Sequence, residues 1–272
     1  MEQNKDTKPI NPLLSKVRLP GQTYRLPSQG LFYNNGELDE SVRNGEVEVF
    51  PMTAIDEILL STPDKLLSGK AVTEVFAHCI PQVKKPNALF SKDVDYLLAC
   101  LRVVTFGPSV EVKFTHTCKD GKEHSYPVDM AAVIKSAQPI DPTTVKNNFF
   151  VTVPNGQKVS LRPVVYSDVV DLYQSTLMTK AMDENSEIDD ELLKDFIVSA
   201  LSGVIQSVDG ETDREMIKEW VLAIPLNWKK QLEDMAQNVS QWGANFETKA
   251  KCKDCDQDIE IPISPNPVSF FI

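Results

Sequence analysis

The residues of this chain that could do chemistry by their type and spacing are cysteines. Cys252 and Cys255 stand three residues apart in the segment CKDC. Two thiolates at this spacing in a tight turn can both reach one tetrahedral zinc ion. A related segment, CKDG, begins at Cys118 and has Gly121 where a second cysteine would stand. The two segments therefore offer three cysteines, and a four-cysteine zinc site is not available.

Two histidines flank the CKDG segment, and either could complete a set of three cysteines and one histidine. Zinc would be the cofactor in this interpretation; in the alternative no cofactor is present and the turns hold their shape without metal. A redox role is less favoured, because thioredoxin-like C-x-x-C motifs open a helix after a strand, whereas this one stands between expected strands. The candidate metal ligands are Cys118, Cys252, Cys255, His116 and His124.

Nucleophilic chemistry is not expected from the other cysteines. Cys79, in the apolar run VFAHCIPQV, and Cys100, in an expected helix, are placed like core residues. No known local signature of a Cys–His nucleophile surrounds Cys79 or Cys118. The sequence also contains no P-loop and no G-x-G-x-x-G, G-x-S-x-G or H-E-x-x-H motif. We therefore expect a protein that is not an enzyme and has no small-molecule substrate.

The composition restricts the class of partner. Among 272 residues, 39 are acidic and 28 are basic, which gives a formal net charge of -11. Such a charge argues against a sequence-independent grip on phosphates, so nucleic acid is not an expected partner. No window approaches the roughly 18 consecutive apolar residues of a membrane span, and the polar opening lacks the apolar stretch of a signal peptide. We expect no membrane span and a protein that is cytosolic where it is made.

The first half of the chain carries signals for a strand, two helices and a hairpin. The alternating segment VEVF predicts a strand, and Thr53 with Asp56 three residues later predicts the start of a helix. Apolar residues at spacings of three and four predict a second helix, with Ser91 as its N-cap and its end before Gly107. A hairpin with CKDG in its turn is expected from two short strands, residues 111–114 and 125–128.

The second half carries signals for further helices. A wide apolar face between Leu192 and Ile205 predicts a helix deep in the core. Thr212 with Glu215 has the spacing of a capping box, which predicts the start of the next helix. The last helix is expected from apolar residues at helical spacing, namely Trp228, Leu232, Met235 and Val239.

The order strand, proline, helices, glycine and hairpin occurs twice, which indicates an internal repeat. VEVFPMTAIDE aligns without gaps with VSLRPVVYSDV and places Pro51 on Pro163 and Asp56 on Asp168. CKDG likewise matches CKDC, and a strand is expected after each. The alternative is that a chain of mixed helices and strands shows this order twice by chance.

We therefore expect an α+β fold of two pseudo-repeated halves, each with short strands, a helical bundle and a knuckle-like β-hairpin. Residues 1–18 are expected to form a flexible arm, residues 19–148 the first half, and residues 149–272 the second half with an apolar tail. Exposure of the tail would forfeit about 1.5–3 kcal/mol of burial for each large apolar side chain. The tail must therefore pack on the chain's own core or bind in a partner's groove, through Phe270, Phe271 and Ile272.

Several segments of the chain share their order with a known family: LPSQGLFY, VEVFPMTAIDEILL, LLACLRVVTFG, the two C-K-D-x hairpins, IQSVDG and the FF ending. In these segments, between residues 19 and 272, the chain resembles the baseplate hub and hub-assembly proteins of T4-like bacteriophages. The resemblance implies a late phage protein that helps to build the hub and wedges of a contractile-tail baseplate. Typical members carry C-x-x-C in both knuckles, and this chain departs from them at Gly121.

The resemblance implies a non-enzymatic protein that binds phage baseplate or tail hub proteins. It would be either a baseplate subunit or an assembly chaperone that leaves before maturation, and the sequence leaves these two roles open. The protein would lie in the host cytoplasm during assembly and, as a subunit, in the virion tail baseplate. A different hypothesis is a zinc-ribbon adaptor that binds another macromolecule, which would require bound metal and a basic face.

Overall fold

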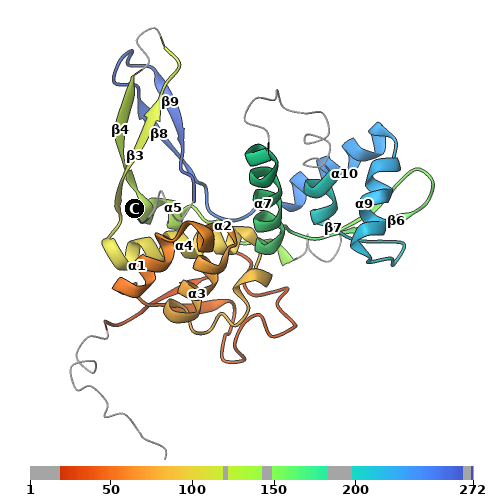
Figure 1. The fold of residues 1–272 in the computed structure, drawn as a ribbon, viewed down its shortest axis with the longest axis horizontal. Coiled ribbons are helices and arrows are strands. Elements are labelled where there is room, and N and C mark those ends of the chain that lie inside the picture. The colour runs from red at the N-terminus through yellow and green to blue at the C-terminus, as the bar shows by residue number, and fades with distance from the viewer. Residues whose placement is uncertain (1–18, 119–121, 143–148, 183–197, 266–270, 272) are drawn as a thin grey trace, which may run out of the picture.

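The computed structural model describes residues 19–118, 122–142, 149–182, 198–265 and 271. Residues 1–18, the expected flexible N-terminal segment, lie outside this part. Helices and strands are mixed along the chain, which confirms the α+β class (Figure 1). Each sheet is small and antiparallel, and the helices pack around the sheets or against one another. No helix in the described part of the chain is both long enough and apolar enough to cross a membrane.

A two-stranded sheet opens the fold. Strand β1 (Gln22–Arg25) pairs antiparallel with β2 (Glu46–Val49), with Gln22 opposite Val49 and Arg25 opposite Glu46. Strand β2 buries Val47 and Val49 on one face, as the alternating VEVF segment predicts.

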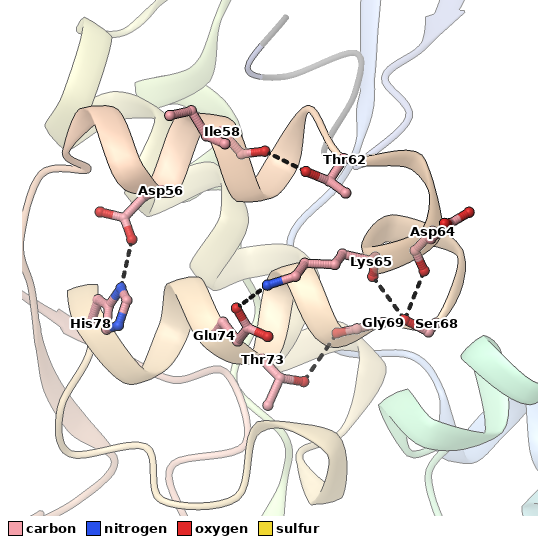
Figure 2. A network of polar contacts seen from close by, with 10 residues as sticks. All are labelled: Asp56, Ile58, Thr62, Asp64, Lys65, Ser68, Gly69, Thr73, Glu74 and His78. Atoms are coloured by element: carbon pink, nitrogen blue, oxygen red, sulfur yellow. Dashed lines mark hydrogen bonds and ion pairs between the residues drawn. The ribbon is translucent and has the colours of Figure 1, made fainter.

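Three short helices follow β2. They are α1 (Ala54–Leu60), α2 (Pro63–Leu67) and α3 (Lys70–Cys79). The expected cap is confirmed, because Thr53 and Asp56 form a capping box at the start of α1. The Asp56 carboxylate also lies 2.9 Å from Nδ1 of His78 on α3, and the Lys65 ammonium on α2 lies 2.7 Å from the Glu74 carboxylate on α3. Figure 2 shows both contacts. Both α1 and α2 are thereby fastened to α3.

Helix α4 (Ser91–Phe106) is the centre of the main core. It follows a 3-10 turn (Pro86–Ala88) and ends at Gly107, whose φ of +85° favours glycine. The expected N-cap is wrong by one residue: the extended backbone of Phe90 precedes the helix, and the Ser91 amide donates to the Val164 carbonyl instead. The largest fully buried side chains around α4 include Leu26, Leu60, Phe76, Leu97, Leu101 and Met130.

A three-stranded sheet carries the second core. Its strands β5 (Phe150–Thr152), β6 (Lys158–Leu161) and β7 (Ile205–Val208) pair in chain order. Helix α7 (Tyr166–Met182) lies between β6 and β7 in the chain, and α9 (Arg214–Ala223) and α10 (Leu226–Val239) follow. The side chains buried in this core include Val159, Leu161, Ile205, Ile217 and Leu232.

Two local expectations in this half are wrong. Ile205 belongs to strand β7 rather than to a helix, because its apolar, partly β-branched segment pairs with β6. Residues 192–197 of that expected helix lie outside the described part. Helix α9 is capped by Asp213 rather than Thr212, since the Asp213 carboxylate accepts hydrogen bonds from the amides of Glu215 and Met216 at 3.0 Å each.

The last hairpin returns to the first half of the chain. Strands β8 (Glu247–Lys251) and β9 (Asp258–Pro262) lie beside β3 (Ser109–Thr115) and β4 (Glu123–Asp129), away from α9 and α10 (Figure 1). Helix α5 (Met130–Lys135) follows β4. Ile263 and Phe271 then enter the core around α4. Residues from both expected halves thus share one core.

Helices α1 and α7 begin with the same contact at the aligned aspartates. Asp56 accepts a hydrogen bond from the Thr53 amide at 2.8 Å, and Asp168 accepts one from the Val165 amide at 3.2 Å. The second carboxylate also accepts one from Arg162 at 2.7 Å. Each of the two aligned aspartates therefore accepts a backbone hydrogen bond at the start of its helix.

Candidate metal centre

The β3–β4 and β8–β9 hairpins pack against each other and form an arm, which we define as residues 109–129 with 247–262 (Figure 1). Four of its side chains are buried together, namely Tyr126, Cys252, Ile259 and Ile261. Half-buried Val112, Phe114, Cys118 and Ala250 surround them. Cys118 and the CKDC turn are therefore brought to the same end of the arm by strands far apart in the sequence.

Backbone hydrogen bonds fix the shape of the turn that carries Cys252 and Cys255. The Cys252 amide donates to the Gln257 carbonyl at 2.9 Å, and the Asp256 amide donates to the Cys252 carbonyl at 2.9 Å. Asp256 takes a left-handed conformation with φ of +57°, which lets the chain reverse tightly before β9. Beside it, the Cys118 amide donates to the His116 carbonyl at 2.9 Å, just after β3.

Four of the five candidate ligands lie together. His116, Cys118, Cys252 and Cys255 each offer one ligand atom, and these four atoms all lie within 4.8 Å of one another. The Cys255 sulfur is 3.6 Å from Nδ1 of His116. The exposure of the side chains ranges from Cys252, which is buried, to Cys255, which is exposed. Each hairpin contributes two of the four groups.

His124, the fifth candidate, is placed elsewhere. Its Nε2 atom lies 2.8 Å from the Asp254 carboxylate, and the Lys122 amide donates to the same carboxylate at 3.3 Å. Asp254 stands between the two cysteines of the CKDC turn, so these contacts join that turn to β4. The imidazole thus binds a neighbour of the ligands, and the pKa of Asp254 is lowered mainly by this contact.

The protonation of the cysteines is set by the turn. Backbone amides of Asp254 and then Cys255 donate toward the Cys252 sulfur, and the pKa of the Cys252 thiol is lowered to about 6. The pKa of Cys255 is raised: the Gln257 amide lowers it, but partial desolvation and the sulfurs of Cys252 and Cys118 outweigh that effect. At neutral pH Cys252 is therefore a thiolate, and a bound cation would also deprotonate the neighbouring cysteines.

A set of three sulfurs and one imidazole nitrogen is chemically suited to zinc. Soft thiolates select Zn²⁺ over Mg²⁺ or Ca²⁺, which prefer oxygen. Structural zinc sites have four protein ligands in a tetrahedron, whereas catalytic ones keep a position open for water. The arrangement here offers four protein ligands, so it has the composition of a structural site.

The two other cysteines are buried in the core around α4. Cys79 faces the Asp56 carboxylate at 3.8 Å, and burial and then Asp56 raise the pKa of its thiol to about 12. Burial also raises the pKa of Cys100. Neither thiol forms the thiolate that nucleophilic attack requires at neutral pH. No local sequence pattern predicts the pairing of His78 on α3 with Asp56 on α1.

The apolar tail is described at one residue. Phe271 is buried in the core around α4, and its ring centroid lies 6.4 Å from that of Phe106. Phe270 and Ile272 lie outside the described residues. Of the two expectations for the tail, packing on the chain's own core is the one that fits the placement of Phe271.

Comparison with known protein families matches residues 39–272 to the family model described as T4 bacteriophage base plate protein. This match spans most of the chain and includes α1 to α4, both hairpins of the arm and the buried tail residue. No curated protein and no solved structure matches the chain. The match confirms the resemblance on the segments from VEVFPMTAIDEILL onward, whereas LPSQGLFY precedes the matched residues.

Proposed function

Because this chain belongs to the T4 bacteriophage base plate protein family, we propose that it is a non-enzymatic hub subunit or hub-assembly factor of the phage baseplate. It acts by binding other baseplate or tail hub proteins, in the host cytoplasm during assembly and, as a subunit, in the virion tail. The family match to most of the chain is the observation that carries this proposal.

An apolar groove between helices supports a role in protein contacts. Its volume is about 580 Å³, and it is lined by α2, α4 and α7 together with Ser264 and Pro265. Leu67, Val169 and Tyr173 line it and remain 39 %, 40 % and 50 % exposed. Apolar side chains that gather in one exposed hollow are typical of a binding surface. In this proposal a side chain of a neighbouring baseplate protein fills the groove.

Two further exposed apolar side chains stand on α1. Ile55 and Ile58 are each 65 % exposed, while Asp56 on the same helix is buried against α3. Helix α1 therefore presents an apolar face away from its own core. Isolated exposed apolar residues are ordinary, but two on one helix turn add to the surface that a partner could cover.

The state of the histidines and cysteines supports a non-enzymatic role. His78 and His124 each pair with a carboxylate, and His116 lies in the cysteine cluster. Cys79, which lies beside the His78–Asp56 pair, is kept protonated by burial. The protein is therefore proposed to act through its surfaces rather than through a nucleophile.

The zinc-ribbon adaptor remains the second candidate, because the cysteine cluster supplies the metal ligands it would need. It would also need a basic face to bind nucleic acid. On the arm, lysines alternate with acids: Lys113 lies 4.0 Å from Glu123, and Lys249 lies 3.5 Å from Glu260. This mixed charge favours a protein partner over nucleic acid.

We also infer that the chain arose by duplication of a unit with a strand, helices and a knuckle-like hairpin. The shared role of Asp56 and Asp168 at two helix starts supports this inference. Superposition of the two halves, with Asp56 on Asp168 and Cys118 on Cys252, tests it. Unrelated chain paths at these positions would overturn it.

Deletion of the gene from the phage tests the proposed function. We expect infected cells to lack complete baseplates by electron microscopy, and expression of the chain from a plasmid to restore them. Normal tails in the deletion phage would refute the proposal.

Mass spectrometry of purified particles beside infected-cell lysate then separates the two roles. A fixed copy number in particles indicates a subunit, and presence in lysate alone indicates an assembly factor.

A further inference from the structure

We propose that His116, Cys118, Cys252 and Cys255 bind one zinc ion, which fastens the β3–β4 hairpin to the β8–β9 hairpin. The site is structural, and His116 takes the place of the cysteine that is missing at Gly121. Neither the family match nor the proposed function assigns this site.

The geometry of the four groups fits a tetrahedral ion. Zinc bonds of about 2.3 Å to sulfur and about 2.0–2.1 Å to nitrogen place neighbouring ligand atoms about 3.5–3.8 Å apart. The Cys255 sulfur and the His116 nitrogen are 3.6 Å apart, and no pair in the cluster exceeds 4.8 Å. Small side-chain rotations would therefore complete the coordination, with no movement of the strands.

The supply of ligands by two hairpins gives the ion its role. His116 and Cys118 follow β3, and Cys252 and Cys255 follow β8, more than a hundred residues later in the chain. An ion bound to all four closes a long loop and holds the two turns together. Because metal binding to a site absent from the unfolded chain adds directly to folding free energy, the ion would stabilise the arm.

The arm has little core of its own. Strands β3 and β8 contain no buried residue, and each alternates between half-buried and exposed positions. Among the described residues of the arm, the cluster of buried side chains has four members, of which Cys252 is one. A hydrophobic core of this size contributes little stability, and small domains of this kind often depend on a structural metal.

Contacts around the cluster hold the ligands in place without metal. Asp254 bridges to His124 and to the Lys122 amide, and Lys253 donates to the Ser125 carbonyl at 2.5 Å while its ammonium lies 5.2 Å from the Tyr126 ring centroid. Lys253 and Asp254 of the CKDC turn thus both contact the other hairpin. The ligand set is thus preorganised by polar contacts that flank it.

The test uses the full chain purified under reducing conditions. Elemental analysis is expected to find one zinc ion per chain, and exchange with cobalt is expected to give the intense visible bands of tetrahedral Co²⁺ with thiolate charge transfer. Removal of the ion by a chelator should accelerate amide hydrogen exchange in residues 109–129 and 247–262, and leave strands β5 to β7 unchanged. A chain that contains no zinc and takes up no cobalt would overturn the proposal.

Two matched histidine variants locate the fourth ligand. Removal of a group that only orients a metal ligand weakens metal binding roughly 10- to 100-fold. Removal of a ligand should cost more, so His116→Ala is expected to weaken zinc binding by more than this factor. His124→Gln should retain the ion, since this imidazole lies outside the cluster. Equal retention by both variants, or equal loss, would refute the assignment. If a variant folds poorly, alkylation of the wild-type chain still tests the site, because bound zinc should protect the Cys118 and Cys255 thiols. A Cys252–Cys255 disulfide in freshly quenched cells would contradict the site.

Discussion

The hydroxyl group of Tyr33 donates a hydrogen bond of 2.6 Å to the carboxylate of Asp93, which is fully buried at the start of α4. The other carboxylate oxygen accepts a hydrogen bond from the Ser28 amide at 3.0 Å. Ser28 and Tyr33 both belong to the segment LPSQGLFY. This segment is therefore held across the N-terminal end of α4 by one acidic side chain, and its role there is structural.

Burial of Asp93 predicts a pH dependence of stability. Burial raises the pKa of Asp93 to about 6, although the bonds from Ser28 and Tyr33 act in the opposite direction. The protonated carboxyl group therefore stabilises the fold below the unfolded pKa of about 4, and this contribution is lost as the pH rises through about 6. Relative to Asp93→Asn, the wild-type chain should lose about 2.5 kcal/mol of unfolding free energy between pH 4 and pH 7.

Urea unfolding of both proteins across this pH range measures the difference. Tyr33 does not titrate there, because burial raises its pKa well above the ordinary value. Asp95 has a pKa raised to about 7 by burial, but it is present in both proteins and cancels in the comparison. A difference between the two proteins that does not change with pH would show that Asp93 is not buried as a carboxylic acid.

The carboxylate of Asp56 predicts a stability effect on the α1–α3 contact. It accepts hydrogen bonds from the Thr53 amide and hydroxyl and lies 2.9 Å from His78 (Figure 2). Asp56→Ala leaves the Thr53 amide and the His78 imidazole without their acceptor, which should cost about 1–3 kcal/mol. Glu57→Gln, at the next and exposed position, is the matched control and should change stability by about 0.5 kcal/mol or less. Thermal unfolding compares the two, and equal melting temperatures would contradict the prediction.

Much of the fold could be predicted from local signals in the sequence. The capping box at Thr53 and Asp56, the helix from Ser91 and the hairpin around CKDG depend on neighbours within a few residues. The helix expected to reach Ile205 ends before it, because a short apolar run fits a buried helix and a buried strand equally well. Phe90 replaces the expected cap because the backbone pairing of Ser91 with Val164 is a tertiary contact.

The residue types of the candidate metal site could be predicted from the sequence, but which of the candidate ligands lie together could not. The spacing of Cys252 and Cys255 indicated metal ligands, whereas the choice between His116 and His124 depends on how two hairpins pack. The His124 contact with Asp254 spans 130 residues, and no local pattern reports it. Asp93 did carry a signal, since it stands four residues before Leu97 on the apolar face of α4 and an acid there needs buried partners.

The buried side chain of Phe271 predicts a cost of truncation at this position. Phe271→Ala removes a ring from the core around α4 and should lower the unfolding free energy by about 3 kcal/mol, the lower end of the range for a buried phenylalanine. Phe150→Ala is the matched control, because that ring is 62 % exposed and its loss should cost much less. Denaturant unfolding measures both. Similar midpoints for the two variants would show that the tail does not pack on the chain's own core.

The groove lined by α2, α4 and α7 predicts a variant that folds but fails in assembly. Tyr173 is half exposed, so Tyr173→Asp should change stability by about 0.5 kcal/mol or less, while it places a charge where an apolar side chain of the partner would lie. Leu222→Asp, on α9 and equally exposed, is the matched control outside the groove. In a deletion phage complemented with each variant, plaque formation should fall with Tyr173→Asp and persist with Leu222→Asp. If Tyr173→Asp complements as well as the wild-type chain, the groove does not bind the partner, and the exposed face of α1 becomes the surface to test.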